Sequence, residues 1–487
     1  MNFFKSKWFI VPWWSVRKST YLVWLMLLGA ILLVILLSSL YIRSLPALDI
    51  WHTTVLKNEF TADSNVKDFQ AYLSLEERLF NALDQEIIDV LPANRQDAIN
   101  RYTKNSLSNP KRWPQNWNRS YEMPLENPKR GVLLIHGMSD SPYSLHTQAE
   151  YLHKKGVYVV GIRLPGHGTI PSGLIDTKWQ DMAAVVQLAM VYLKEKVGKG
   201  PVSIMGYSTG APLALNYTFH ALKESNLPLP ESLIFYSPAI GVSSAAKFAS
   251  LQKWAAKLLN SDKLEWNSVL PEYDPFKYGS FSINAAQQVY LLCKKVQKQF
   301  DGYHENVQKP FPSVLTFASA VDSTISVPAI IEGLYDRLPE GNNTLVLFDI
   351  NNKFRQHLLV RDRTLRSIHT LRSTVSTDKY TFEFLSDLNS SDGNLHLIRD
   401  GHHVTDLNLG WPKYVYSLSH ISLPFSRFDP LYGSVDAPES PGIQLGHLAA
   451  YGETAVLQIA PSVLLRQRWN PFHEYTKQKV LDFLDLQ

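Results

Sequence analysis

The sequence predicts an α/β protein: a mostly parallel sheet with helices on both faces and a helical cap insertion, preceded by one N-terminal transmembrane helix. Three observations support this fold class. From Gly131 onward, short apolar runs alternate with helical patterns, as in parallel sheets covered on both faces. The stretch Val202–Leu222 passes from an apolar strand through a Gly-x-Ser-x-Gly turn into a helical pattern. Residues 21–42 contain no charged side chain.

The charge distribution separates the N-terminus from the rest of the chain. The 487 residues carry a formal net charge of +4, and the first 42 residues hold four of the 48 basic side chains and no acidic one. The remaining chain is therefore neutral, with 44 acidic residues in all. Nucleic-acid binding needs clustered positive charge, so a nucleic-acid partner is not expected. The single Cys293 excludes an intramolecular disulfide framework.

The uncharged run Tyr21–Ile42 is long enough to cross an apolar layer of about 30 Å as a helix. A cleavable signal peptide is the alternative, but its apolar core usually spans only about 7 to 15 residues. Basic residues precede this run and are scarce after it, which predicts a single-pass protein with residues 1–20 in the cytoplasm. The rest of the chain would then be extracytoplasmic, or periplasmic in a cell with two membranes.

Residues 43–128 form an N-terminal extension that we expect to pack on the main domain. One helical pattern stands out, with apolar side chains spaced to share one face. These side chains are Phe69, Leu73, Phe80, Leu83 and Ile87. That face is expected to dock on the main domain, with helix-mediated dimerisation as the alternative. Residues 109–128 are rich in Pro, Asn and Trp and are interpreted as an irregular linker.

The main domain is expected to cover residues 129–487. Strands are predicted at residues 131–137, 202–205, 231–240, 312–326 and 343–351, and residues 157–168 are predicted to form a strand and the loop after it. Helices are predicted at residues 146–156, 178–198, 210–222, 328–339 and 473–486. Two segments interrupt this alternation of strands and helices. One is a helical cap insertion at 241–310, and the other is an insertion of mixed pattern at 351–415 whose role the sequence does not indicate.

Ser208 is the candidate nucleophile, because a serine in a sharp strand-to-helix turn is strained and exposed above the sheet. The glycines Gly206 and Gly210 would avoid collisions with the neighbouring strand and helix. The alternative is an ordinary glycine-rich turn. A serine hydroxyl is a poor nucleophile near neutral pH, so it needs a histidine base and a carboxylate that orients the imidazole.

Three motifs together resemble the α/β-hydrolase family, specifically its serine esterase and lipase branch with a lid. They are HGMSDSPYS at 136–144, GYSTG at 206–210 and SAVDSTIS at 319–326. In addition, RLPGHGT at 163–169 is similar to a loop of monoacylglycerol lipases and small bacterial carboxylesterases. The resemblance implies an oxyanion hole formed by the N–H groups of Met138 and Thr209. His136 is expected only to brace its loop.

Asp322 is the candidate carboxylate, because it follows a predicted strand and comes after Ser208 in the chain. The alternative for Asp322 is a helix N-cap before the helix that begins near Pro328. Other aspartates fit the pattern less well. They are Asp301, Asp336 and Asp349.

The general base is expected among the histidines after Asp322, since the family order is Ser, Asp, His. His420 is the leading candidate, in a loop that looks like the histidine segment of membrane-anchored bacterial relatives. Adjacent His402 and His403, in a polar glycine turn, remain open alternatives, as does His357 soon after a strand.

These features predict a membrane-anchored serine hydrolase that cleaves carboxylic esters of small molecules or lipids through Ser208, Asp322 and His420. The same triad could serve an acyltransferase, a thioesterase or a peptidase. A non-catalytic interaction module is the alternative outside enzymology. No cofactor or metal is expected, because no His-Glu-x-x-His or Cys-x-x-Cys pattern is present. The oligomeric state is not indicated.

Overall fold

The computed structural model describes residues 13–92, 99–241, 259, 261–303, 309–353, 360–374, 379–388, 390, 393–400, 402–448 and 459–486. Its centre is one large sheet with the strand order β1-β3-β2-β4-β5-β8-β9-β10-β11-β12. The pairs from β3 through β10 are parallel, whereas β1 at one edge and β11 and β12 at the other are antiparallel to their neighbours. This architecture confirms the predicted fold class.

The strands of the sheet are β1 (Tyr121–Met123), β2 (Gly131–Ile135), β3 (Tyr158–Ile162), β4 (Val202–Tyr207), β5 (Ser232–Tyr236), β8 (Ser313–Ser319), β9 (Thr344–Phe348), β10 (Thr381–Ser386), β11 (Asn394–Arg399) and β12 (His402–Gly410). A separate two-stranded sheet consists of β6 (Trp266–Ser268) and β7 (Phe281–Ser282).

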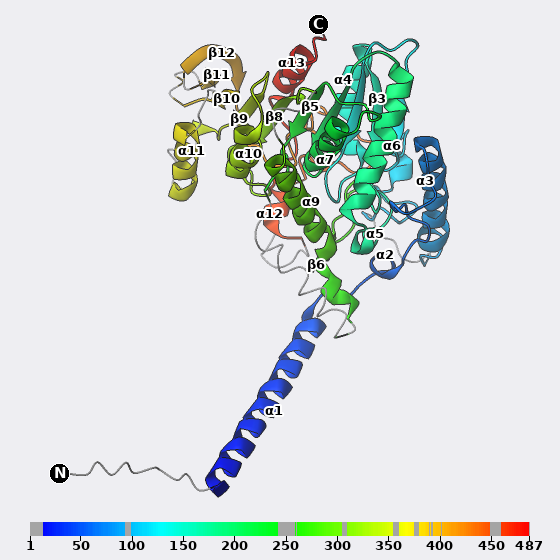
Figure 1. Cartoon of the computed structure of the whole chain (residues 1–487), viewed down its shortest axis with the longest axis vertical. Coiled ribbons are helices and arrows are strands. Elements are labelled where there is room, and N and C mark those ends of the chain that lie inside the picture. The colour runs from blue at the N-terminus through cyan, green and yellow to red at the C-terminus, as the bar shows by residue number, and fades with distance from the viewer. Residues whose placement is uncertain are drawn as a thin grey trace, which may run out of the picture.

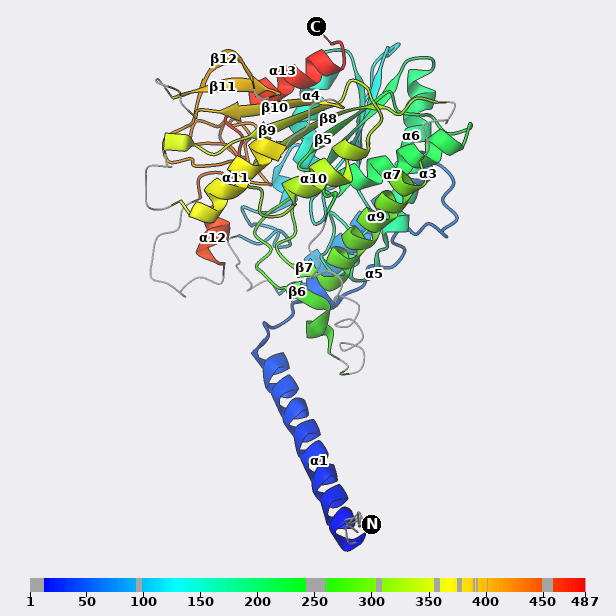
Figure 2. The same ribbon diagram turned by 60° about the vertical axis from the view of Figure 1, so that its left-hand side comes forward.

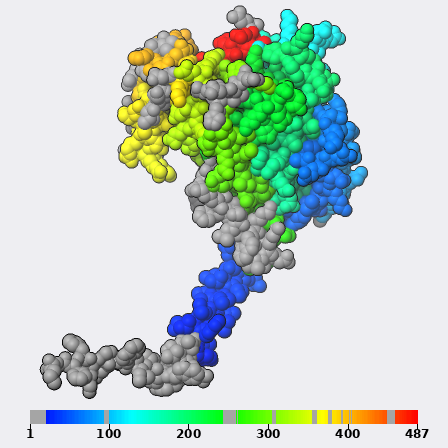
Figure 3. All heavy atoms as spheres, viewed as in Figure 1, coloured from blue at the N-terminus to red at the C-terminus, as the bar shows by residue number. Residues whose placement is uncertain are grey.

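The helices are α1 (Trp13–Ser44), α2 (Ile50–Thr53), α3 (Phe69–Leu83), α4 (His146–Lys154), α5 (Gly173–Asp176), α6 (Trp179–Val197), α7 (Gly210–Lys223), α9 (Ile283–Asp301), α10 (Val327–Gly333), α11 (Asp362–Thr374), α12 (Pro461–Leu464) and α13 (His473–Phe483). Figure 1 shows α1 projecting from the folded body, and Figure 3 shows the body as one continuous mass of atoms above it.

The central strands are buried on both faces because successive side chains point to opposite sides. In β2, Leu133 and Ile135 belong to the core beneath α6, α7 and α9, whereas Val132 and Leu134 belong to the core beneath α4 and α13. Each strand therefore needs apolar residues at every position. This requirement explains why the strands are recognisable in the sequence as short apolar runs.

The carboxyl edge of the sheet lies toward the end of the molecule from which α1 projects. Figures 1 and 2 both draw α5 and β6 at that end, and these elements follow the carboxyl ends of β3 and β5 along the chain. The Nζ atom of Lys263, just before β6, donates a hydrogen bond to the carbonyl of Leu45, one residue after α1 ends. Loops at the carboxyl edge are therefore close to the point where α1 leaves the domain.

The N-terminal extension packs on the main domain through α3. Phe69 stacks against Tyr72 and contacts Tyr192 of α6, and Phe80 and Leu83 are buried with Ile87 in a further cluster. The linker after it, predicted to be irregular, contains a short strand that the sequence did not indicate: β1 pairs antiparallel with β3. Three residues are too few for a period-2 pattern to be visible.

The segment 351–415 leaves and re-enters the domain at one point. The backbone N–H of Asn351 donates to the carbonyl of Tyr416 at 2.8 Å, and its side-chain amide donates to the carbonyl of Val415 at 2.9 Å. Between these contacts, β10 extends the parallel sheet beside β9, and β11 and β12 form its outer edge. The loop that follows therefore restarts next to the end of β9.

Helix α1 includes the segment Tyr21–Ser44, which is long and apolar enough to cross a membrane. At 1.5 Å per residue its 24 residues span about 36 Å. The side chains of this segment are almost all exposed, so α1 has no apolar partner within the described residues.

Candidate active site

Ser208 lies in the sharp turn between β4 and α7. Its backbone φ angle is +52°, in the left-handed region that non-glycine residues rarely adopt. Hydrogen bonds hold this strained conformation from both sides: the Ser208 N–H donates to the Tyr236 carbonyl at 2.9 Å, and the Ala239 N–H donates to the Ser208 carbonyl at 3.1 Å. Strain of this kind persists only where the surrounding structure enforces it.

Both glycines of the turn are required by close backbone contacts. A Cβ atom on Gly206 would lie 2.7 Å from the backbone nitrogen of Ala211 at the start of α7. A Cβ atom on Gly210 would lie 2.1 Å from the carbonyl oxygen of Ile135 at the end of β2. Any side chain at either position would therefore push the helix or the strand away from the turn.

The loop after β2 runs directly beside Ser208. A Cβ atom on Gly137 would lie 3.0 Å from the Cβ of Ser208. Neither the Met138 N–H nor the Thr209 N–H donates a hydrogen bond within the described part of the chain. Thr209 is also the N-cap of α7, where the helix dipole favours negative charge. These two N–H groups are available to an oxyanion.

The segment before β7 is bound to the loop after β2 by a hydrogen bond and an ion pair. The Tyr278 N–H donates to the carbonyl of Ser139 at 2.9 Å, and Lys277 forms an ion pair with Asp140. Ser139 itself has a left-handed φ of +64°. Part of the predicted cap insertion thus contacts the loop beside Ser208, although residues 242–258 of that insertion lie outside the described residues.

His136 has both ring nitrogens occupied. Its Nε2 accepts a hydrogen bond from the Leu164 N–H at 3.0 Å, so its Nδ1 carries the proton and donates to the Gly137 carbonyl at 2.8 Å. Burial, together with the nearby ring of His167, holds the pKa of His136 well below its usual value. A neutral imidazole with no free nitrogen can brace this loop but cannot accept a proton from Ser208.

Asp322 and His420, 98 residues apart in the chain, are hydrogen bonded. The Nδ1 of His420 lies 2.9 Å from Oδ2 of Asp322, and both side chains are buried. Because a carboxylate can only accept, Nδ1 carries the hydrogen and Nε2 is left as the acceptor nitrogen. This is the tautomer that a general base requires.

The Asp322 carboxylate is held in its ionised form. Its other oxygen accepts the N–H groups of Thr324 at 2.8 Å and Ile325 at 3.1 Å. Burial alone would raise the pKa of Asp322, but His420 and these two N–H groups outweigh it and lower the pKa below its ordinary value. The N-cap of α10 is Ser326, not Asp322.

The imidazole of His420 packs beside the serine turn. Its ring lies 5.3 Å, centroid to centroid, from the ring of Tyr207, the residue before Ser208. The Tyr207 hydroxyl also donates a long 3.4 Å hydrogen bond to the His420 carbonyl. The hydrogen bonds of His420 are to Asp322 and Tyr207, and none joins it to Ser208 Oγ within the described residues. Such contacts are often long without substrate and tighten in the reacting complex.

The other histidine candidates lie elsewhere. His402 and His403 begin β12, which is six strand positions from β4. At about 4.8 Å per strand, this separation is roughly 30 Å. The side chain of His402 is exposed. His357 lies outside the described residues.

A buried charge network, which no sequence motif indicated, connects the N-terminal extension to the loop after β3. Arg163 is fully buried, and its guanidinium binds the carboxylate of Glu59 through two hydrogen bonds of 3.0 and 2.7 Å. Glu76 of α3 lies 3.4 Å from the Nε of Arg163 without forming a hydrogen bond to it, and accepts two hydrogen bonds from Ser120.

The two carboxylates respond differently to this environment. Burial opposes ionisation of both, but the paired guanidinium of Arg163 outweighs it at Glu59 and lowers that pKa, whereas burial dominates at Glu76 and raises its pKa. One signal in the sequence could have identified Glu76, since it shares the apolar face of α3 with Tyr72 and Phe80. A charged residue on an apolar face needs a buried partner.

Replacing Glu59 by alanine should destabilise the protein by about 3 to 5 kcal/mol, because Arg163 would keep a buried charge without its main partner. Since the folded pKa of Glu59 is lowered, its contribution is present above the unfolded value of about 4.3 and is lost as pH falls through the folded pKa. Denaturant unfolding in detergent would measure this effect. Glu77→Ala, on the exposed face of α3, is the control, and an equal loss there would contradict the role of the network.

Within the described residues, no group of three or more His, Cys, Asp or Glu side chains could hold a metal ion. Around Ser208 the structure places a strained turn, the Met138 and Thr209 N–H groups, and a histidine hydrogen bonded to an ionised carboxylate.

Comparison with known proteins supports a hydrolase. Residues 126–349 match the family model described as "Serine aminopeptidase, S33". A thermostable monoacylglycerol lipase from Bacillus sp. (strain H-257) is 35% identical over 95 residues. This match covers 20% of the present chain and only 37% of the length of that relative.

Similarity to solved structures is lower. A soluble variant of monoglyceride lipase from Saccharomyces cerevisiae aligns with 17% identity and a TM-score of 0.37, covering 47% of this chain and 82% of the other. A monoacylglycerol lipase of Paleococcus ferrophilus aligns with 18% identity and a TM-score of 0.35, covering 47% and 89%. Similarity at this level does not bear on the substrate.

Proposed function

Because residues 126–349 of this chain belong to the α/β-hydrolases whose family model they match, we propose that it is a membrane-anchored serine hydrolase that cleaves carboxylic esters. Ser208 is the nucleophile, His420 is the general base and acid, and Asp322 orients His420. The observation that carries the proposal is the 2.9 Å hydrogen bond between His420 and a buried, ionised Asp322 beside the strained Ser208 turn.

The first half of the reaction forms an acyl-enzyme. Nε2 of His420 takes the proton of the Ser208 hydroxyl as Oγ attacks the ester carbonyl carbon. The carbonyl oxygen becomes an oxyanion, which the N–H groups of Met138 and Thr209 stabilise. His420 then passes its proton to the departing alkoxide, and the C–O bond of the ester breaks.

The second half regenerates the enzyme. A water molecule gives a proton to Nε2 of His420 and attacks the acyl carbon, and the same two N–H groups stabilise the second oxyanion. Collapse releases the carboxylic acid and returns the proton to Oγ of Ser208. Asp322 stays ionised throughout and stabilises the imidazolium that forms twice in each cycle.

An ester with an acyl chain, such as a lipid, is the proposed substrate class. The carboxyl edge of the sheet faces the end from which α1 projects (Figures 1 and 2). The hydrogen bond from Lys263 to Leu45 ties a segment at that edge to the end of α1. If α1 lies in a bilayer, the catalytic edge is close to the lipid surface. The partial match to a monoacylglycerol lipase also supports this class.

Hydrolysis of a p-nitrophenyl ester series from acetyl to palmitoyl by the full chain in detergent tests the proposed reaction. Turnover should be detectable for esters and should favour a defined range of acyl-chain lengths. Each methylene group that an apolar site buries contributes about 0.8 kcal/mol to the binding free energy. A peptide p-nitroanilide and an acyl thioester serve as comparison substrates. Preferential cleavage of either would contradict the ester assignment, and no turnover of any substrate would favour a non-catalytic protein.

The proposed topology is a single span with the N-terminus in the cytoplasm and residues after α1 outside it. A reporter fused after Gln487 should be active only when it is outside the cytoplasm, because four basic residues precede the span. The protein should also resist carbonate extraction. A soluble product beginning near residue 45 would instead identify the segment as a cleaved signal.

A further inference from the structure

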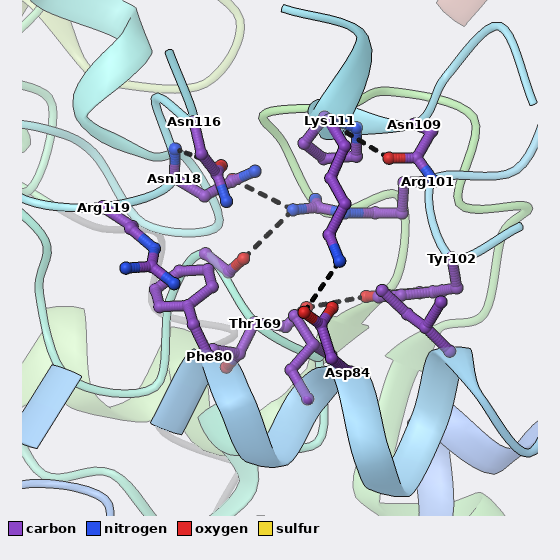
Figure 4. A pocket seen from close by; sticks show the side chains of 14 residues that line it. Phe80, Asp84, Arg101, Tyr102, Asn109, Lys111, Asn116, Asn118, Arg119 and Thr169 are labelled. Atoms are coloured by element: carbon purple, nitrogen blue, oxygen red, sulfur yellow. Dashed lines mark hydrogen bonds and ion pairs between the residues drawn. The ribbon is translucent and has the colours of Figure 1, made fainter. Parts of the chain in front are cut away.

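A small cavity of about 40 Å³, open to solvent on one side, lies between the N-terminal extension and the loop after β3 (Figure 4). One wall is apolar and consists of Phe80, Leu83 and Ile88 at the end of α3 and just beyond it. The rest of the lining is mostly polar and includes Gly168 and Thr169 of the loop after β3. This cavity is separate from the groups gathered around Ser208, and nothing in the proposed reaction uses it.

Arg101 provides a buried positive charge in the cavity. The residue is 2% exposed, and its guanidinium points into the space between the labelled side chains in Figure 4. Nη2 donates to Asn118 Oδ1 at 2.9 Å and to the Gly168 carbonyl at 3.2 Å. Nη1 is buried and has no hydrogen-bond partner within the described residues. A buried guanidinium N–H without an acceptor is costly, so a ligand that accepts it would bind favourably.

Nearby acids do not neutralise Arg101 through direct ion pairs within the described chain. The closest influence is Glu272, whose carboxylate accepts the N–H groups of Gly279 and Ser280 instead. Tyr102 and Tyr278 lie against the guanidinium of Arg101, with ring centroids 5.7 and 5.2 Å from its central carbon. These contacts fix its position, and Glu272 offsets part of its charge without forming an ion pair with it.

Two more cations line the cavity. Lys111 forms a 2.7 Å ion pair with Asp84, but both side chains are solvent-accessible, so this pair contributes little energy and can open. Arg119 lies over the ring of Phe80 at 4.5 Å. The lining therefore carries three positive charges and one negative charge. The excess of positive charge on the lining favours an anionic occupant.

We propose that this cavity binds a phosphate group, with Nη1 of Arg101 as the buried donor and Lys111 and Arg119 closing over the exposed oxygens. A phosphate offers several strong acceptor oxygens and nearly two negative charges at neutral pH, which a single carboxylate does not. Either inorganic phosphate or the phosphomonoester headgroup of a lipid supplies this chemistry.

The cavity is also connected to the membrane-proximal chain and to the catalytic loops. Trp51, seven residues after α1 ends, stacks on Tyr102 at 4.9 Å. The hydroxyl of Tyr102 donates to the Thr169 carbonyl at 3.0 Å, in the loop whose Leu164 N–H binds His136. A bound phosphate would add hydrogen bonds between the N-terminal extension and the loop after β3. Because it binds only the folded protein, it would also raise the unfolding temperature.

Titration of the full chain in neutral detergent with inorganic phosphate, against sodium chloride of equal ionic strength, tests the site. Calorimetry and the unfolding temperature should both report saturable binding. The double variant Lys111→Gln, Arg119→Gln should weaken phosphate binding at least about tenfold, since it removes two charge-assisted hydrogen bonds to the phosphate oxygens. It should keep its ester hydrolysis, which shows that it is folded.

Arg112→Gln is the matched control, because Arg112 is adjacent to Lys111, is exposed and does not line the cavity. Equal weakening in this control, or no saturable binding beyond the chloride reference, would overturn the proposal. The buried Arg101→Gln variant should lose binding as well, but the two rim substitutions decide the question if it fails to fold. Competition of phosphate by short-chain phosphatidic acid, and not by phosphatidylcholine, would identify a lipid headgroup as the source.

Discussion

The Ser208→Ala variant should lose ester turnover by a factor of about 10^4 or more while its unfolding transition stays close to that of the wild type. The turnover falls because no other group can form the acyl-enzyme, and the residual rate comes from substrate binding and the oxyanion hole alone. Folding is nearly unaffected because Ser208 Oγ makes no hydrogen bond within the described residues. Alanine also keeps a Cβ in the same strained turn.

Two measurements separate this prediction from a general loss of structure. A fluorophosphonate probe should label the wild type and fail to label Ser208→Ala, because the probe reacts with an activated serine. The surface variant Ser225→Ala is the control and should keep both labelling and turnover. Activity of Ser208→Ala within tenfold of the wild type would end the assignment of Ser208 as nucleophile.

The central fold was predictable because its strands are buried on both faces. Runs such as Val202–Met205 must be apolar at each position, so they differ from the amphipathic helices between them. The face of α3 that carries Phe69 and Phe80 was also predictable from its helical spacing. The strand β1 was missed because three residues do not show a period.

Contacts between segments that are distant in the sequence were harder to predict. Glu59 and Arg163 are 104 residues apart, and no local pattern indicates that they pair. The cavity around Arg101 depends on how the extension sits against Gly168, which the sequence does not encode in any motif. His402 and His403 remained alternatives for the base because they follow a polar glycine turn, but they begin β12, which pairs antiparallel with β11 at the edge of the sheet. Polar glycine turns occur in both settings.

The long gap between Asp322 and His420 is explained by the closing contact of the second insertion. The bonds from Asn351 to Val415 and Tyr416 return the chain to the end of β9. The hydroxyl of Ser319, at the end of β8, then donates to the Leu418 carbonyl at 3.0 Å, which fixes the loop two residues before His420. The histidine loop therefore begins from the same part of the sheet as it would without the insertion.

The His420→Ala variant should be about as inactive as Ser208→Ala, and the double variant should be no worse than either, because members of a triad act as a unit. Steady-state turnover of the best ester in the chain-length series would measure this. The control is His402→Ala, His403→Ala, which changes two histidines at the outer strand, roughly 30 Å from the serine turn, and should keep most activity. An active His420→Ala enzyme together with an inactive His402/His403 variant would assign the base to the edge hairpin. That result would require the hairpin to fold over the carboxyl edge of the sheet during catalysis.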